Sequence, residues 1–169
     1  QLNNSEILGS SLNIPYFHII SQNKDITFKP TIFDENIQMY QAEYRQENLN
    51  SSFIADFNFV KGYESTTLNK KSSLTHLFSK YDLDLKINNY VNSFVSIFVE
   101  KLNNDTYLKV FDTNLFDINK DIKPKSNSNL HSGIKLELDN DDFNFSAGMD
   151  VFEDLAIGKS SDKYEYILH

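Results

Sequence analysis

The chain has 169 residues, with 24 acidic against 16 basic side chains, a net charge of −8 and no cysteine. That length suits one domain with a buried core, and the lack of cysteine excludes disulfide scaffolds, thiolate zinc sites and cysteine nucleophiles. The acidic balance, with no basic run longer than Lys70-Lys71, argues against a nucleic-acid partner, and no apolar run approaches the roughly 20 residues of a membrane-spanning helix.

Alternation of apolar and polar residues predicts an all-β chain with eight strands and no convincing helix. The clearest stretch is 77–87, where Leu77, Tyr81 and Ile87 fall on one face while Lys80 and Lys86 fall on the other. In chain order, the predicted strands are 26–33, 36–46, 51–61, 74–87, 90–102, 129–139, 143–153 and 163–168.

The connections between these strands alternate in length from the third onward, with long segments at 62–73, 103–128 and 154–162 and short turns between them. Outer-membrane barrels have this pattern, with short periplasmic turns and longer outer loops, so the three long connections are expected to face outside. Several strands also reach the 9 to 11 residues that cross a membrane, whereas soluble strands average about five or six. The fold expected is an antiparallel meander forming an arc of a large transmembrane barrel.

In that fold the two faces of each strand meet different surroundings. The polar positions expected to line the lumen are Asp82, Asp84, Lys135, Glu137 and Asp150. The apolar positions expected to face lipid are Leu83, Leu85, Leu136, Phe145 and Met149. Alternation alone equally describes a soluble sheet packed on a second sheet. About eight strands could also close as a small complete barrel that binds a lipid or another small ligand.

Several segments resemble one family, the outer-membrane lipopolysaccharide-assembly protein LptD, also called OstA. NIPYFHII at 13–20 and DITFKP at 25–30 are similar to the segment that opens its barrel. IQMYQAEYR at 37–45 is similar to its next strand, NDTYLKVFD at 104–112 to a later loop, and SDKYEYIL at 161–168 to its S-D-R-Y-E-Y-x-L-P motif. The resemblance covers most of the chain and is weakest between Lys61 and Ser73.

Two positions depart from the family pattern: Phe17-His18 stands where a Tyr-Trp pair is common, and His169 stands where proline is expected. The resemblance implies that residues 1–20 are the end of a periplasmic jelly roll and the entry to the barrel. It implies that residues 21–169 are the first strands of an outer-membrane barrel in a Gram-negative cell. Because the chain begins at Gln1 without an initiator methionine or a signal-peptide pattern, we expect a piece of a longer protein.

By the same resemblance, the function is insertion of lipopolysaccharide into the outer leaflet. The implied partners are lipopolysaccharide, a plug lipoprotein of the LptE type and a periplasmic bridge protein of the LptA type. Pro15 and Pro30 correspond to two prolines that weaken strand pairing at a lateral gate. Without the family, the same prolines describe the end of a linker and an edge strand, because proline has no N–H to donate.

Chemistry of other kinds has little support in the sequence. The four histidines, His18, His76, His131 and His169, are scattered over separate elements and suggest no metal site. Residues 117–121 resemble the start of a calcium loop but lack its glycine and its glutamate. No catalytic triad or phosphate loop is present, so neither an enzyme nor a cofactor is expected. A transport barrel, a small ligand-binding barrel and a soluble adhesion or carbohydrate-binding sandwich remain open.

Overall fold

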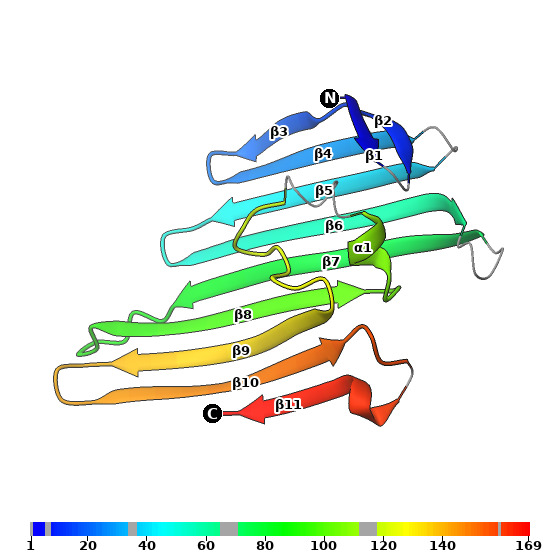
Figure 1. Ribbon diagram of the computed structural model, residues 1–169. Coiled ribbons are helices and arrows are strands. Elements are labelled where there is room, and N and C mark those ends of the chain that lie inside the picture. Colours follow the sequence, from blue (N-terminus) through cyan, green and yellow to red (C-terminus); the bar gives the residue numbers. More distant parts are fainter. Residues whose placement is uncertain (1, 6–7, 34–36, 65–70, 112–117, 159) are drawn as a thin grey trace.

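The computed structural model describes residues 2–5, 8–33, 37–64, 71–111, 118–158 and 160–169. They form one open antiparallel sheet of eleven strands, which Figure 1 shows lying side by side nearly in chain order. The strands are β1 (Leu2–Ser5), β2 (Gly9–Asn13), β3 (Tyr16–Ser21), β4 (Lys24–Phe33), β5 (Gln38–Glu47), β6 (Ser51–Glu64), β7 (Lys71–Asp84), β8 (Asn92–Leu102), β9 (Asn129–Asp139), β10 (Asn144–Asp154) and β11 (Tyr164–Leu168).

The expected antiparallel meander is confirmed for β4 to β11, which pair consecutively and lie within a few residues of the eight predicted strands. The sheet stays open, because among the described residues β11 pairs only with β10. The alternative of a small closed barrel is therefore wrong for this part of the chain. A sandwich of two stacked sheets is likewise not formed by the described strands, all of which belong to one sheet.

Strands β1, β2 and β3 were not predicted. β2 and β3 both pair with β4, β2 at residues 31–33 and β3 at residues 24–28. Because β3 crosses the sheet once before β4, it determines the end of the sheet at which the chain enters. The connections after β3, β5, β7 and β9 lie at one end, and β2 lies at the other together with the connections that follow β8 and β10 (Figure 1). The chain therefore enters at the end that carries the long connections.

Residues opposite one another in neighbouring strands share a face, so the register divides the sheet into two faces. The polar face carries Asp82, Ser96 and Lys135 in one row, and the apolar face carries Leu83, Val95 and Leu136 in the adjacent row.

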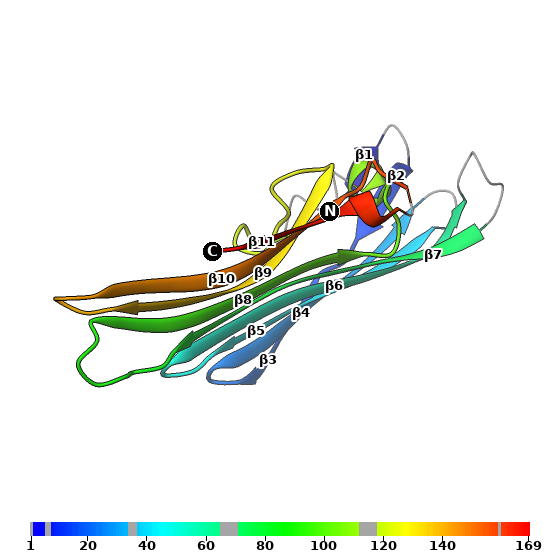
Figure 2. The same ribbon diagram turned by 90° about the horizontal axis from the view of Figure 1, so that it is seen from below.

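The polar face is the covered one. Residues 103–111 and 118–128, together called the cap segment, lie over its long-connection end and include the single-turn helix α1 (Tyr107–Val110) (Figure 2). Tyr107, Leu108 and Phe111 belong to the buried core that also contains Met39, Val60, Leu74 and Phe78 of the sheet. Those sheet residues lie on the same face as the buried polar residues. The core therefore lies between the polar face and the cap segment.

Sheet pairing between β8 and β9 ends at Phe98 and Gly133. A Cβ atom at Gly133 would lie 2.7 Å from the backbone oxygen of Met149 and 2.8 Å from the ring of Phe98, so a larger residue would force the backbone to shift. Beyond this point β9 and β10 rise away from β8 (Figure 2). Leu130 thereby enters the core although alternation assigns it to the apolar face.

Candidate functional site

The two prolines flank one junction at the N-terminal edge of the sheet. Pro15 lies between β2 and β3, and the carbonyl of Pro30 in β4 accepts a hydrogen bond from Ile14 N at 3.2 Å. The N–H and C=O of a strand residue point to the same side, so the donor that Pro30 lacks would also point toward this junction. Both missing donors therefore fall at the break between β2 and β3.

Strand β3 continues the edge beyond that junction. It pairs with β4 from Tyr16 to Ser21, with a register shift between Ile19 and Ser21. Within the described part of the chain, no strand pairs with its other side. Tyr16, Phe17 and Ile19 are all more than half exposed, so this edge is apolar as well as open.

The five polar residues expected to face a lumen do share the polar face. Ser96 donates to Asp82 at 2.6 Å, and Lys80 lies 2.8 Å from the same carboxylate. Lys135 pairs with Glu137. Half-exposed ion pairs of this kind lie on a solvated surface. Each contributes little to the free energy of unfolding, typically about 0 to 1 kcal/mol. The short-turn half of the polar face is thus a hydrated surface of matched charges.

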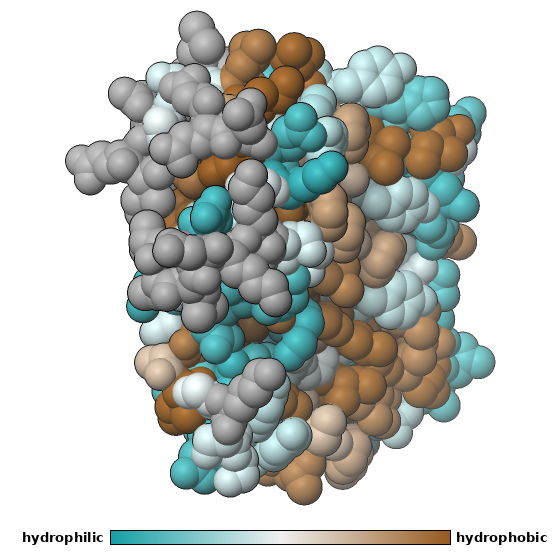
Figure 3. All heavy atoms as spheres, turned by 90° about the vertical axis from the view of Figure 1, so that its right-hand side faces the viewer, coloured by the Kyte–Doolittle hydropathy of each residue, from teal (hydrophilic) through white to brown (hydrophobic). Residues whose placement is uncertain are grey.

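The five apolar residues expected to face lipid lie on the opposite face. Leu85 is 37% exposed, Phe145 41% and Met149 41%, while Leu83 and Leu136 are half-buried among their neighbours. Figure 3, seen from the long-connection end, shows many hydrophobic residues gathered on one side of the molecule, with hydrophilic residues among them. What this apolar surface contacts stays a prediction.

A buried hydrogen-bond network fixes the cap segment to the polar face. Asn58 Nδ2 donates to Tyr107 Oη, so the Tyr107 hydroxyl is left to donate to His76 Nδ1 at 2.8 Å. His76 then carries its proton on Nε2 and donates to Asp56 Oδ1 at 2.5 Å. Gln41 donates to both oxygens of Asp56. All five groups are buried, so the network stabilises one position of the cap.

Burial also changes the acidity of the phenol in this network. Desolvation raises the pKa of Tyr107 well above its usual value, and the negative charge of Asp56 adds to the rise. The hydrogen bond from Asn58 acts in the opposite direction and is outweighed. The phenol is therefore held neutral as a donor to His76.

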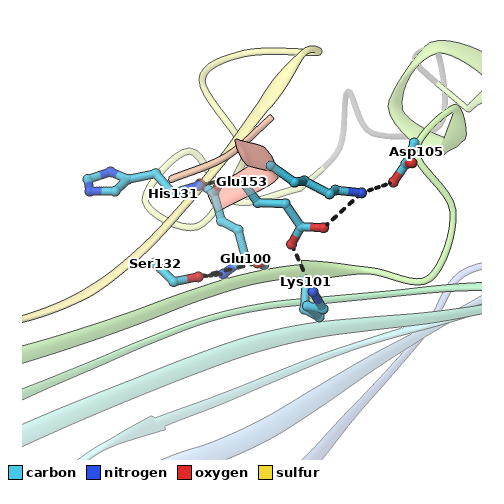
Figure 4. A network of polar contacts seen from close by, with 7 residues as sticks. Glu100, Lys101, Asp105, His131, Ser132 and Glu153 are labelled. Atoms are coloured by element: carbon cyan, nitrogen blue, oxygen red, sulfur yellow. Dashed lines mark hydrogen bonds and ion pairs between the residues drawn. The ribbon is translucent and has the colours of Figure 1, made fainter. Parts of the chain in front are cut away.

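A second, more exposed network joins the cap segment to the C-terminal strands (Figure 4). Lys163, in the short helix η2 (Ser161–Lys163), lies 2.7 Å from Asp105 and 3.3 Å from Glu153. Glu153 also binds Lys101 of β8 at 2.8 Å. The hydrogen bond to Asp105 is the largest cause of a raised Lys163 pKa. These residues bridge β8 and β10 where the sheet pairing has ended.

Side chains also replace the lost ladder between β8 and β9 (Figure 4). Glu100 N donates to Ser132 Oγ at 2.9 Å, and the Glu100 carboxylate accepts from His131 N at 2.8 Å. These contacts satisfy backbone donors that would otherwise be unpaired.

The histidines are less scattered than the sequence suggested, since His131 and His169 both approach Asp150, at 2.8 and 3.6 Å. Among the described residues no group of three or more potential ligands could hold a metal ion. Of the calcium-like stretch, Asp117 lies outside the described residues. Asn119 Oδ1 accepts from Asp121 N at 2.9 Å, which closes an ordinary turn.

The sequence did not reveal the Asp56–His76–Tyr107 network. These residues are 20 to 51 positions apart, and only the strand register brings Asn58 opposite His76. The one available signal was the unusual set of polar residues in otherwise apolar windows, such as Asp56 and Asn58 in residues 51–61. By alternation alone, that set predicts a solvated face and not a buried network.

A comparison with family models finds no match, and a search of curated proteins finds no similar sequence.

None of the helices formed by the described residues is long and apolar enough to cross a membrane.

Proposed function

We propose that this chain is part of the wall of an outer-membrane β-barrel translocon that inserts lipopolysaccharide into the outer leaflet. The observation that carries the proposal is the inverted covering of the sheet. The cap segment covers part of the polar face, which also carries ion pairs. No described segment covers the apolar face along β4 to β11. A face of Leu, Ile, Phe and Met is stable without cover if lipid surrounds it.

Strand length supports a membrane position. β6 to β10 have 11 to 14 residues each. At about 3.3 Å per residue and a tilt near 40°, such strands span the roughly 25 Å apolar band of an outer-membrane barrel. The residues of β6 on the apolar face fit this band. They include Phe53, Phe57 and Phe59, and Lys61 follows them at the edge of the band.

The cargo follows from the sequence resemblance. The segments around Pro15 and Pro30 resemble the barrel opening of LptD, and both prolines lie at one weakly bonded junction beside an open edge strand. In the proposal this edge is half of a lateral gate, and the other half is supplied by a strand from another part of the barrel. The plug lipoprotein and bridge protein enter only through the same resemblance.

The additional strand β3 changes the orientation we assign. A chain that arrives from a periplasmic domain would enter the barrel at its periplasmic end. Since β2 and the long connections share one end of the sheet, the cap segment would then lie on the periplasmic side. This replaces the expectation that the three long connections face outside, because that expectation did not include β3.

The gate is tested by restoring the missing donors in the full-length protein. Replacing Pro15 and Pro30 by alanine adds at most one backbone hydrogen bond at each position, typically worth about 0.5 to 1.5 kcal/mol. The double variant should deliver lipopolysaccharide to the cell surface more slowly at normal barrel levels, because release requires an open seam.

Pro124, in the cap segment, provides the matched control. Its replacement by alanine should leave surface delivery unchanged when barrel levels are equal. Normal delivery by the Pro15→Ala, Pro30→Ala double variant would contradict the gate role and leave both prolines as strand-edge residues.

A further inference from the structure

Strands β8 and β9 separate at the long-connection end of the sheet and leave a split between them. Their pairing ends at Phe98 and Gly133, although β8 stays paired with β7 as far as Leu102 and β9 stays paired with β10 along its whole length. Residues 99–102 of β8 and 129–132 of β9 are therefore the two rims of the split. The rims can move apart without breaking a hydrogen bond of a strand ladder.

Two glycines mark the place where β9 and β10 turn away from β8. Gly133 and Gly148 lie in these neighbouring strands at the start of the split. A Cβ atom would lie 2.7 Å from the backbone oxygen of Met149 at the first position and 2.7 Å from the ring of His169 at the second. Glycine inside a strand typically marks a bend or the close approach of another group. The ends of β9 and β10 beyond these glycines therefore form one paired unit that can turn about them.

Side chains close the split in place of a ladder (Figure 4). Ser132 Oγ accepts from Glu100 N at 2.9 Å, and His131 N donates to the Glu100 carboxylate at 2.8 Å. Four charged side chains, joined in order at 2.8, 3.3 and 2.7 Å, make a second closure that we call the clasp: Lys101, Glu153, Lys163 and Asp105. The clasp connects β8 and the cap segment to β10 and η2.

Two cavities meet at these contacts. One, of about 590 Å³, lies on the polar face and is lined in part by Glu100 and Phe152. The other, of about 620 Å³, is lined in part by the clasp residues Glu153 and Lys163. Phe152 and Glu153 are consecutive strand residues, so their side chains point to opposite faces of β10. The contacts that close the split therefore lie between the two cavities.

We propose that the split is a side opening in the wall of the sheet, which the clasp holds closed and which joins the two cavities when the clasp releases. Within the clasp, Lys101 keeps 55% and Asp105 44% of its side chain exposed. Ion pairs with this exposure are screened by salt, so dissolved ions weaken the clasp. Burial of Leu130 and Leu155 in the core opposes opening. The open form is therefore a minor one whose population rises with ionic strength.

Glu100 favours the open form. Burial raises the pKa of its carboxyl group, and this effect outweighs the hydrogen bond from His131 N and the nearby side chains of His131 and Lys125. The closed form therefore disfavours the ionised carboxylate, and opening returns that carboxylate to water.

The split is a property of the sheet and exists whether or not the chain transports lipid. In the barrel proposed above, it would connect the polar face with the apolar face at a place five strands away from the edge formed by β3. The β3 edge and the split are therefore separate features, and each has its own test.

The reaction rate of a single buried cysteine measures the opening in purified full-length protein freed of other reactive cysteines. Leu130→Cys places the thiol on a rim of the split, at a residue that is 1% exposed. A water-soluble maleimide reaches this thiol only in the open form, so the rate follows the open population when the split closes faster than the thiol reacts. Raising the salt concentration from about 0.05 M to about 1 M should speed labelling about threefold.

Removing the clasp charges should have the same effect at low salt. The Lys101→Gln, Lys163→Gln double variant should label about threefold faster at Leu130→Cys and should no longer respond to salt. Lys135→Gln, which removes an ion pair with Glu137 in the paired half of β9, should behave like the parent protein. Val60→Cys, at a fully buried residue between β6 and the cap segment, should keep one labelling rate under all these conditions.

Equal acceleration at Leu130→Cys and Val60→Cys would show that the whole core loosens and would overturn the side opening. An unchanged rate at Leu130→Cys in high salt would overturn it as well. Amide hydrogen exchange repeats the comparison without any substitution. The His131 N–H, which bonds to Glu100, should exchange faster in high salt, whereas the amides of residues 134–138 should not. Exchange at His131 that ignores salt would contradict the clasp.

Discussion

The two faces of this sheet differ in a way that reverses the usual order of a soluble protein. The polar face is covered at its long-connection end by the cap segment, with Tyr107 and Phe111 buried against the strands. The apolar face is left open, and Ile134 on it is 43% exposed. A soluble single-sided sheet would bury the apolar face and hydrate the polar one.

In the proposed barrel, lipid and not water contacts the apolar face. Large contiguous apolar patches are rare on soluble monomers, and those that occur mark contacts with proteins or membranes. The covered face also explains how polar residues can be buried safely. Gln41 supplies partners for the Asp56 carboxylate, and Tyr107 supplies one for His76 Nδ1 and one for Asn58 Nδ2.

The largest effect is expected where the cap segment contacts the polar face. Tyr107→Ala removes a fully buried ring and the hydrogen-bond partner of Asn58 Nδ2 and His76 Nδ1. We expect a loss of about 3 to 5 kcal/mol in the free energy of unfolding of the full-length protein, measured in urea. The exposed Tyr166 of β11 is the control. Equal losses for Tyr107→Ala and Tyr166→Ala would show that the cap is not packed as described.

The apolar face should tolerate charge poorly, and the polar face should tolerate it well. Leu136→Arg should cost about 2 to 4 kcal/mol for a strand position near the middle of a bilayer. Glu137→Arg, one residue along the same strand, should cost much less, because its side chain lies on the hydrated face beside Lys135. Refolding into bilayers under a urea gradient measures both. Similar costs at the two positions would argue against lipid contact.

The buried phenol should make the cap sensitive to alkali. The folded pKa of Tyr107 is raised above its unfolded value near 10, so the stabilisation is complete below pH 10. It is lost as the pH rises further, because the unfolded phenol releases its proton first. Unfolding free energies at pH 8 and 11 should therefore differ less for Tyr107→Phe than for wild type. An unchanged difference would contradict the burial of this group.

The exposed network should matter least. Asp105→Asn removes one partner of Lys163, while Glu153 still lies 3.3 Å from its ammonium group. Asp105 is 44% exposed in its side chain, so we expect a loss of only about 0.2 to 1 kcal/mol, reduced further by salt. Thermal unfolding at low and high ionic strength measures this. A loss larger than that caused by Leu136→Arg would contradict the minor role assigned to this ion pair.

Much of the fold could be predicted because apolar and polar residues alternate along a strand whose two faces contact different environments. β7 and β9 show this best, with Leu83 and Leu136 alternating with Asp82 and Lys135. β3 was missed because Tyr16, Phe17, Ile19 and Ile20 place apolar residues on both faces. β1 and β2 were missed because their sequences, LNNS and GSSLN, have almost no apolar residues to alternate.

The cap segment could not be predicted for a different reason. Tyr107, Leu108, Val110 and Phe111 have helical spacing, but four residues are too few to stand out from an irregular loop. Its position depends on hydrogen bonds to residues 31 and 49 positions away. No local pattern records such partners. The interruption of pairing near the prolines, in contrast, agrees with the rule that proline restricts strand pairing, although Pro30 lies in β4, which pairs on both sides and is not an edge strand.

The central claim is that the apolar face contacts lipid, and single labels test it most directly. The chain has no cysteine, so Leu136→Cys and Glu137→Cys can each carry one fluorophore in full-length protein freed of other reactive cysteines. In bilayers containing brominated lipid, the label at 136 should be quenched by lipid and protected from aqueous iodide. The label at 137 should show the opposite. Quenching of both labels by iodide alone would contradict the claim.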